Sequence, residues 1–535
     1  MCVLGYPFLR QEDILTAMLS AAETLSDDPA ILKDMVVAQS AEIHNQNILI
    51  EKLKAQLSGM QRHRFGQSSE KLDQLEMTLE NAEIAALPIE PAKEQPALEE
   101  KQKPVRKALP EHLERIDDIL PVPEESCKEC GGHLRPLSES ITEELDYIPA
   151  RFVVRRIIRP KRSCRACETI HQAPMPTRPI ERGRPTAGLL AHVLVSKYCD
   201  HLPLYRQSQI YAREGIDLSR STLAGWVAQS AQLLEPLAES IGKHVMAGDA
   251  IFADDTTTQV QAPGQGKTRT GRIWAYVRDE RGYNGNAAPA AYYKYSPDRK
   301  GAHPQEHLKG FSGFMHVDGY TGYNAAVEDN NITEVACLAH IRRKFFDVHQ
   351  ANGSTLALEA LEHIAKLYQI EKQIKGQPPD IRRQVRQEQA EPLLQKFEDW
   401  LHQTHKAISG KTPLAAAIRY ALSRLPKLKT YLDDGRLEID NNAAERAMRP
   451  IALGRKNYMF MGSDGGGKAA AILYTLIETA KMNGINPQDW LTDVLTRIPD
   501  HSINKVDELM PWNYVSHKIQ SSSSISEGIL TKNYA

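Results

Sequence analysis

The feature that most constrains this chain is an apolar run that ends in an acid, within Gly313–Tyr320. The run leads into Asp318, and Gly319 and Gly322 then allow the chain to turn. An apolar run of this length that ends in glycine predicts a buried strand. A carboxylate at the end of a buried strand costs free energy unless a cation neutralises it. The stretch therefore predicts a carboxylate that needs a cationic partner.

Two further acids fit the same pattern. Ala250–Asp254 also runs from apolar residues into an acid, and Glu445 follows much later in the chain. Any one of these acids, taken alone, is more often a surface or capping carboxylate. Together they lead us to expect that Asp254, Asp318 and Glu445 meet around divalent metal ions.

The order of the expected elements indicates how the acids come together. The expected elements are strands over 251–260, 271–278 and 291–295, a short helix over 304–309, a strand over 314–318, and a fifth strand at 334–338 or a direct start of the helix through 345. This order is that of a ribonuclease-H-like fold. In such a fold the first acid lies on the first strand, the second at the end of the fourth, and the third on a late helix.

These acids suit phosphodiester chemistry. Breaking or transferring a phosphodiester needs an activated oxygen nucleophile and a stabilised leaving oxygen, which two Mg²⁺ ions about 4 Å apart provide. Mg²⁺ prefers hard oxygen ligands and keeps water molecules, so a few carboxylates suffice. We expect two Mg²⁺ ions per site, with Mn²⁺ as a substitute. Asp255 is an alternative to Asp254, but adjacent strand residues point to opposite faces.

Length and charge limit the classes of protein to which this chain can belong. A chain of 535 residues is too long for one ordinary domain. Its net charge of −2 means that a nucleic-acid partner must be met by a local basic patch. We expect no membrane association, since no apolar run reaches the roughly 18 to 20 residues of a membrane span. We also expect no secretory signal at the amino terminus.

Four of the seven cysteines form two C-x2-C pairs, Cys127 with Cys130 and Cys164 with Cys167. Each pair supplies two thiolates from one tight turn, and two such turns make a closed tetrahedral Zn²⁺ site. We expect a structural zinc ribbon in a reducing compartment. Four thiolates leave no open position, which argues against a catalytic zinc. The alternative is four unrelated buried thiols.

A basic segment surrounds the second pair of cysteines. Its candidates for DNA contact are Arg155, Arg156, Arg159, Lys161 and Arg162. Such a local excess suits phosphate contacts, although a solvated basic face is the alternative. Beyond it, 189–234 predicts several short helices. Gly215 is expected to end one helix and Ser219 to cap the next, as in a helix-turn-helix, with plain helical packing as the alternative.

The amino-terminal part is helical and charged. Val36, Ile43, Ile50 and Leu57 recur every seven residues. This spacing predicts a self-associating coiled coil, or else one amphipathic helix that packs on its own domain. The proline-rich segment 87–110 that follows predicts a disordered linker.

Two later stretches bear on the candidate site. Asn441 is expected to cap a short helix that Pro450 helps to terminate, with Glu445 and Arg449 on one face. Gly462–Ala469 has the glycine and lysine spacing of a phosphate-binding loop. Ala469 stands where that loop needs Ser or Thr, so we expect a flexible loop or a DNA-phosphate contact instead of a nucleotide site.

Many ordered motifs, spread over roughly residues 30 to 515, carry a family resemblance. They are Arg64–Lys71, the two C-x2-C pairs, Ser196–Tyr198, Leu202–Arg206, Ala253–Thr256, Val317–Tyr320, Cys337–Phe345, Asp440–Arg446 and Leu509–Asn513. In these motifs the chain resembles the transposases of the insertion sequence 66 family. The ends, residues 1–28 and those after 517, match nothing.

The resemblance implies a DDE-type DNA transposase with Asp254, Asp318 and Glu445 as its acids. It implies a leucine-zipper-like start, a zinc-finger domain, and a helical segment at the carboxyl end. Cys337 and His340 match a C-x2-H signature seen in such transposases, either as support for catalysis or as part of a packed core helix. Further candidates for DNA contact are Arg343, Arg446, Arg449 and Lys468.

We therefore expect a multidomain α/β protein, bacterial, cytoplasmic and nucleoid-associated. Its expected parts are a helical or coiled-coil oligomerisation region 22–85, a disordered linker 86–112, a zinc ribbon 113–182, a helix-turn-helix-like DNA-binding region 183–245, a ribonuclease-H-like core 246–350 and 437–480, a helical insertion 351–436, a helical segment 481–516 and a disordered tail 517–535.

The expected activity is metal-dependent cleavage of the element ends and strand transfer into target DNA. The expected partners are these DNAs, further copies of the chain, and accessory proteins encoded by the same element. The alternative is a zinc-containing DNA-binding protein or regulator without catalysis.

Overall fold

The computed structural model describes residues 175–514 except 182, 263 and 265, together with 33, 42, 45–48, 152, 154, 157, 161–163 and 170–172. The chain divides into two compact units, one of Glu90–Pro174 and one of Met1–Ile89 with Met175–Ala535. The expected linker, the expected tail and nearly all of the expected coiled coil lie outside the described residues. So do the four cysteines of the expected zinc site and Arg155, Arg156 and Arg159.

The smaller unit contains a two-stranded antiparallel sheet. Strand β1 (Lys161–Ser163) pairs with β2 (Ile170–Gln172), and Ser163 lies opposite Ile170. In the sequence, the second C-x2-C pair falls between these two strands. Lys161 and Arg162, two of the expected DNA-contact residues, lie on β1.

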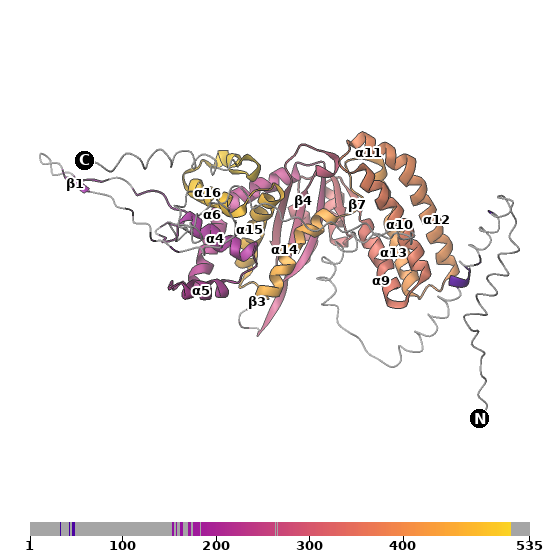
Figure 1. Cartoon of the computed structure of the whole chain (residues 1–535), viewed down its shortest axis with the longest axis horizontal. Helices are drawn as coiled ribbons and strands as arrows, with labels where there is room; N and C mark the ends of the chain where they lie inside the picture. Colours follow the sequence, from indigo (N-terminus) through magenta and orange to yellow (C-terminus); the bar gives the residue numbers. More distant parts are fainter. Residues whose placement is uncertain are drawn as a thin grey trace, which may run out of the picture. The chain divides into compact units, whose positions relative to one another are not determined.

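The larger unit is built around a five-stranded mixed sheet (Figure 1). In chain order the strands are β3 (Ala250–Ala262), β4 (Lys267–Arg278), β5 (Ala290–Ser296), β6 (Gly313–Val317) and β7 (Ile332–Ala336). Their order in the sheet is β5-β4-β3-β6-β7, with β3, β4 and β5 antiparallel and β3, β6 and β7 parallel. The expected strands are confirmed, within a few residues at their ends.

Short helices connect the later strands. Helix α7 (Ala302–His307) precedes β6, and α8 (Asn324–Asp329) precedes β7. Ile251, Phe252 and Ala253 are buried in succession at the start of β3. Such consecutive burial is typical of a strand that is covered on both faces. The start of β3 therefore lies at the centre of the sheet, between β4 and β6.

The segment after β7 is helical, and it includes the region 351–436 that was expected to be a helical insertion. Helix α9 (Leu338–Asn352) leads into α10 (Thr355–Ile374), α11 (Pro379–Val385), α12 (Glu391–Ala407) and α13 (Pro413–Asp433). One apolar cluster runs from Val335 on β7 through these helices to Ile439. Ile48 of the amino-terminal region also packs against this cluster. The insertion is thus continuous with the β7 edge of the sheet.

The remaining helices lie on the β5 side of the sheet, except α14 (Asn442–Tyr458), which crosses β3 and β4 (Figure 1). They are α4 (Ala187–Tyr198), α5 (Leu204–Arg213), α6 (Arg220–Met246), α14, α15 (Asp464–Met482) and α16 (Pro487–Arg497). Helix α14 packs on β3 and β4, α15 packs on β5 and α6, and α16 packs on α4. The last part of the chain therefore contacts the helices that precede the sheet.

The helical pattern before the sheet is only partly as expected. Gly215 has a φ of +77° after α5, and the Ser219 hydroxyl accepts a hydrogen bond of 3.1 Å from the Thr222 amide at the start of α6. The predicted end of α5 and the predicted start of α6 are confirmed. The expectation of several short helices is wrong for α6, which has 27 residues and continues through Pro236. Its buried face, packed on α4 and β5, stabilises this length.

The expected short helix at Asn441 is also wrong. Helix α14 has 17 residues and continues through Pro450 to Tyr458. Pro450 cannot donate an intrahelical hydrogen bond, which costs stability. Met448 and Ile451 on either side are buried against the sheet, so packing offsets that cost.

The glycine-rich stretch 462–468 is not a flexible loop. Helix α15 begins at Asp464, and the Ser463 hydroxyl caps it by accepting a hydrogen bond of 3.2 Å from the Gly466 amide. A Cβ atom on Gly467 would lie 2.5 Å from the Tyr295 ring. Gly467 therefore allows the helix to approach β5 closely, which explains one of the glycines without a bound phosphate.

Candidate active site

Asp254 and Asp318 lie on neighbouring parallel strands. Asp254 belongs to β3, and Asp318 directly follows the last residue of β6. The register pairs Ala250 with Phe314 and Phe252 with His316. Continued by two residues, this register sets Asp254 level with Asp318, and neighbouring strands lie about 4.8 Å apart. The sheet thus brings the first two predicted acids to the same position at the carboxyl end of β6.

Asp255, the alternative to Asp254, has a different environment. Its buried carboxylate accepts hydrogen bonds of 2.8 Å from Arg272 Nη1 and from Arg299 Nη2. Burial raises the pKa of Asp255, and the two arginines counter that effect. Asp255 is therefore a paired carboxylate on the opposite side of β3, which favours Asp254 as the acid of the candidate site.

Glu445 lies in the first turn of α14, and Asn441 fixes the start of that helix. The Asn441 side chain donates a hydrogen bond of 2.9 Å from Nδ2 to the carbonyl oxygen of Ala253, directly before Asp254. The Glu445 amide donates to the carbonyl oxygen of Asn441 at 3.2 Å. One fully buried asparagine thus joins the strand that carries Asp254 to the helix that carries Glu445.

The electrostatics agree with this arrangement. Burial raises the pKa of Asp254 well above its ordinary value, and the charges of Asp318, Asp255 and Glu445 raise it further. Asp440, next to Asn441, has its pKa raised to about 7, mainly by burial, with Glu438 and Glu445 contributing. A bound cation would relieve the repulsion between these acids.

A second contact joins β6 to the segment that precedes α14. His316 is fully buried and stacks on Phe252, with the ring centroids 4.4 Å apart. Its Nε2 lies 3.0 Å from the Glu438 amide nitrogen and 3.1 Å from the Glu438 carbonyl oxygen, and its Nδ1 faces the Ile251 carbonyl oxygen at 3.3 Å. Burial lowers the pKa of His316 to about 4, which keeps the ring neutral. His316 therefore holds the start of the segment that leads to Glu445.

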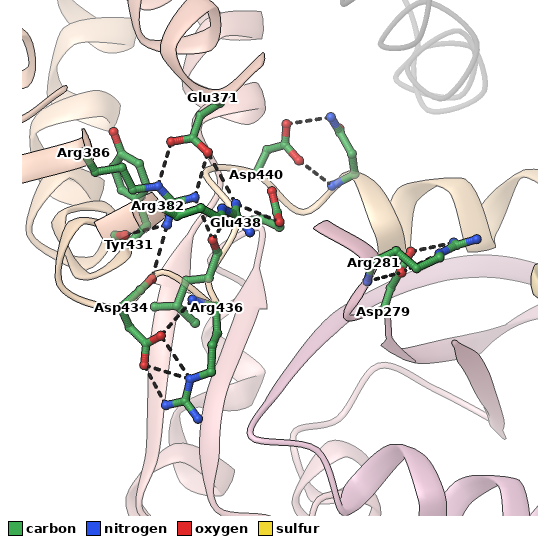
Figure 2. Close-up of polar contacts among 12 residues, drawn as sticks. Asp279, Arg281, Glu371, Arg382, Arg386, Tyr431, Asp434, Arg436, Glu438 and Asp440 are labelled. Carbon is green, nitrogen blue, oxygen red and sulfur yellow. Dashed lines mark hydrogen bonds and ion pairs between the residues drawn. The ribbon is translucent and has the colours of Figure 1, made fainter. Parts of the chain in front are cut away.

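A buried ion network anchors this segment to the insertion (Figure 2). Arg386 donates to Glu371 through Nε at 2.8 Å and Nη2 at 2.7 Å, and Nη2 also donates to the Leu437 carbonyl oxygen at 2.9 Å. Arg382 donates to Glu438 Oε1 at 2.9 Å. Both arginine side chains are at most 1% exposed. The network links α10 and α11 to residues 437 and 438.

The predicted DNA-contact residues differ in exposure. Arg446 follows Glu445 on α14 and its side chain is 55% exposed, and Lys468 is exposed in the first turns of α15. Arg449 is partly buried one turn after Glu445. The Arg343 side chain is only 15% exposed and faces Asp347 at 3.6 Å. Arg446 and Lys468 are the better candidates for contact with a phosphate.

Sequence reasoning did not assign three residues that shape this site. Asp440 and Asn441 were part of a recognised motif, but the motif does not reveal that Asn441 reaches Ala253. His316 stands within an apolar run, where a histidine gives little signal of its own. A polar side chain inside an otherwise apolar strand is the one feature that could have indicated a buried hydrogen-bonding role.

Comparisons with known families agree with the motifs. Residues 182–469 match the model described as Transposase IS66 family, and 475–512 match the IS66 C-terminal element. Residues 124–168 match the zinc-finger binding domain of transposase IS66, which supports structural zinc. Residues 52–117 match a model described as Transposase C of IS166 homeodomain.

Several relatives come from Sinorhizobium fredii. The chain is 40% identical to the uncharacterized protein y4hP over 87% of this chain and 88% of the relative. It is 36% identical to the uncharacterized protein y4jD, over 89% and 97% of the two chains. It is 37% identical to the uncharacterized protein y4qI, over 94% and 97%.

Among the described residues, no helix is both long and apolar enough to cross a membrane. The family match covers more than half of the chain, and the relatives match along nearly their whole lengths. The chain therefore belongs to the IS66 family of transposases.

Proposed function

We propose that this protein is a DDE-type DNA transposase that binds the ends of its insertion sequence, cleaves the DNA there, and joins the freed end to target DNA. One observation carries the proposal. Asp254 and Asp318 are level on adjacent parallel strands, and Asn441 ties the helix of Glu445 to the residue before Asp254. This geometry supports the convergence of three acids from distant parts of the chain.

The residues fit divalent metal ions. Asp254 is a carboxylate whose pKa is raised first by burial and then by Asp318, Asp255 and Glu445. Asp255 has two arginine partners, but its neighbour Asp254 accepts only the backbone amide of Asp255, at 2.7 Å, among the contacts of the described residues. Hard, mutually repelling oxygens of this kind are what Mg²⁺ or Mn²⁺ prefers. When bound, such ions activate the attacking oxygen and stabilise the leaving oxygen.

The chemistry would proceed in two displacements. Water attacks the phosphorus atom at the element end, the bond to the 3′ oxygen breaks, and a 3′-hydroxyl is released. That hydroxyl then attacks a phosphodiester of the target DNA, and a target 3′ oxygen leaves. Asp254, Asp318 and Glu445 would hold the metal ions, and Arg446 and Arg449 would neutralise the phosphates beside Glu445. Asn441 and His316 position the elements that carry these acids.

The wider architecture supports the same proposal. The sheet order, with α14 across β3 and β4, supports a ribonuclease-H-like core over 246–350 and 437–480, with 351–436 as a helical insertion. Strands β1 and β2 beside a C-x2-C pair support a zinc ribbon. The exposed start of α6 supports DNA contact by the helix-turn-helix-like region. Self-association through a coiled coil and a need for accessory proteins remain part of the proposal.

The test is cleavage of DNA that carries the element ends, in Mg²⁺, with any accessory proteins of the element supplied. Wild-type protein should nick the ends, and Asp318→Asn should not. Asp329→Asn is a matched control, because Asp329 ends α8 on the surface, away from the acids. Equal cleavage by wild type and Asp318→Asn would refute the proposal. Binding of the ends without any cleavage would instead identify a DNA-binding protein that lacks catalysis.

A further inference from the structure

A second cluster of metal-ligating side chains lies beside the acids. Cys337, His340 and Glu445 each offer one ligand atom, and these atoms all lie within 4.8 Å of one another. Cys337 precedes the first residue of α9, His340 lies in its first turn, and Glu445 lies in the first turn of α14. A thiol, an imidazole and a carboxylate form a donor set unlike the oxygens of Asp254 and Asp318. The first preference of such a set is a transition metal.

The surrounding backbone holds the thiol toward Glu445. The Asn441 amide donates a hydrogen bond of 3.1 Å to Cys337 Sγ, while the Asn441 side chain is bound to Ala253. Cys337 and His340 are three residues apart at a helix start, so their side chains lie on one side of the helix. Supporting hydrogen bonds to a ligand atom are typical of metal sites in proteins.

His340 has an unfilled bonding position in this cluster. Its Nδ1 atom is buried and has no hydrogen-bond partner among the residues that the structure describes. It faces Glu445 Oε1 at 3.5 Å, which is long for a hydrogen bond. Buried polar atoms of side chains nearly always have a partner. An ion between the imidazole, the thiol and the carboxylate would supply one.

We propose that Cys337, His340 and Glu445 bind a divalent transition metal, with Zn²⁺ as the best match, in a site separate from the structural zinc. Zn²⁺ accepts thiolate, imidazole and carboxylate ligands together, whereas Mg²⁺ strongly prefers oxygen. Three protein ligands leave a fourth position for water or a substrate oxygen. Binding needs no DNA and does not depend on the function proposed above. Because a carboxylate has two oxygens, Glu445 can also serve the acid site.

Metal binding changes the protonation state of Cys337. Burial raises the pKa of the Cys337 thiol well above its ordinary value, and the charges of Glu445 and Asp440 add to the effect. The thiol is therefore protonated without a metal. Zn²⁺ binds the thiolate, so one proton leaves Cys337 for the solvent as the sulfur–metal bond forms.

The test uses full-length protein stripped of metal with a chelator and then dialysed against Co²⁺, which occupies zinc sites and reports thiolate ligands by their charge-transfer absorption. Wild type should bind about one equivalent more per chain than Cys337→Ser, and His340→Gln should show the same loss. Cys199→Ser is a matched control, because Cys199 is a free cysteine at the end of α4. It should bind as much Co²⁺ as wild type.

Unchanged Co²⁺ content in folded Cys337→Ser and His340→Gln would overturn the proposal. Circular dichroism shows whether each variant folds. If both fail to fold, zinc-edge anomalous diffraction from wild-type crystals decides, and absence of a peak between Cys337 and His340 would refute the site. Asp254→Asn should keep the thiolate-to-Co²⁺ charge-transfer absorption that Cys337→Ser loses, whether or not it cleaves DNA, because Asp254 supplies no sulfur ligand. Failure of the metal site and failure of the transposase proposal are therefore separate results.

Discussion

Two groups of buried charges, one around Asp254 and one around Arg386, are built in opposite ways. Arg386 is fully enclosed, and Glu371 and three backbone carbonyl oxygens accept its hydrogen bonds. Burial raises the pKa of Asp254, and the further acids around it raise it more. The guanidinium of Arg386 has all its hydrogen bonds without a ligand, and such a group serves the fold. Carboxylates gathered without enough cations cost stability, which is typical of a functional site.

Asp255 sharpens this contrast within one strand. Asp254 and Asp255 are adjacent on β3, yet Asp255 has Arg272 and Arg299 as partners. Side chains of adjacent strand residues point to opposite faces. One step along the strand thus separates a charge that stabilises the fold from a charge that destabilises it in the absence of a cation.

The largest effect is expected from removal of one of the acids Asp254, Asp318 and Glu445. Asp254→Asn should lower the rate of DNA cleavage by about 10³-fold or more, because one of the ligands of the metal ions is lost. Its stability at pH 7 should stay level or rise by about 1 kcal/mol, because repulsion and the cost of a buried charge disappear. Cleavage assays and urea unfolding measure the two effects.

Asp255→Asn is the matched comparison for that variant. It should lose about 3 kcal/mol of stability, since Arg272 and Arg299 would keep buried or half-buried charges without their partner. If Asp254→Asn were the variant that loses stability, and Asp255→Asn the stable one, the two acids would have been assigned to the wrong roles.

The next largest effect is expected from removal of the hydrogen bonds of Arg386. Arg386→Met should lower the free energy of unfolding by about 3 kcal/mol, because Glu371 would remain buried with only Arg382 nearby, at 3.5 Å. Arg383→Met is the control, since Arg383 is exposed on α11, three residues before Arg386, and it should change stability by less than about 0.5 kcal/mol. The double variant Arg386→Met/Glu371→Leu should recover part of the loss. Equal stability of Arg386→Met and wild type would show that the network contributes nothing.

A pH series should separate the acid group from the paired one. Asp440 has a pKa of about 7 in the folded protein against an ordinary value near 3.8, mainly because of burial. The folded state therefore binds this proton more tightly than the unfolded chain. The stability that this group contributes is present below about pH 4 and is lost as pH rises to about 7.

Asp440→Asn should therefore reduce the fall in stability between pH 4 and pH 7 by about 1–2 kcal/mol. The measurement is urea unfolding at several pH values, in the absence of divalent metal ions. Asp434→Asn is the comparison, because Arg436 lowers the pKa of Asp434 against the effect of burial. The loss of stability on acidification that Asp434 causes should shrink in that variant. A pH profile of Asp440→Asn that matches wild type would contradict the assigned cause.

Local patterns were enough to predict the strands and the end of α5. Apolar runs that end in acid locate β3 and β6, and Ser219 marks the start of α6, because these signals lie within a few residues of each other. That Asp254 and Asp318 lie on adjacent strands followed from the expected order of elements. These parts of the structure can be predicted with little reference to residues that are distant in the sequence.

The rest depends on partners that are far apart in the sequence. Glu371 and Arg386 lie among many charged residues of helices, and nothing local distinguishes them from a solvated face. Asn441 reaches a carbonyl group 188 positions away. Pro450 and the glycines of 462–468 carried strong local signals for an end and a loop, and tertiary packing overrode both. The four cysteines of the expected zinc ribbon lie outside the described residues, and their binding of Zn²⁺ stays a prediction.

The smallest expected effect concerns Arg446, which lies beside Glu445 but is 55% exposed, whereas Arg386 is enclosed. Its contact with Asp279 spans 4.0 Å, and Arg281 already holds that carboxylate with hydrogen bonds of 2.7 and 2.8 Å (Figure 2). Arg446→Ala should therefore change stability by less than about 0.5 kcal/mol. DNA binding should weaken several-fold, and the slope of log affinity against log salt should fall by about 1.

Arg386→Met gives the opposite pair of results if the two regions differ as argued. Its stability should fall, while the salt slope for DNA binding in native buffer should stay as in wild type, because a cation enclosed by α10, α11 and residues 431–437 cannot reach a phosphate. Fluorescence anisotropy with labelled element-end DNA at several salt concentrations measures the slope. A reduced slope for Arg386→Met would mean that the insertion opens and that this arginine reaches DNA. An unchanged slope for Arg446→Ala would mean that this exposed arginine does not contact DNA. Either result would show that exposure does not decide which arginines bind DNA.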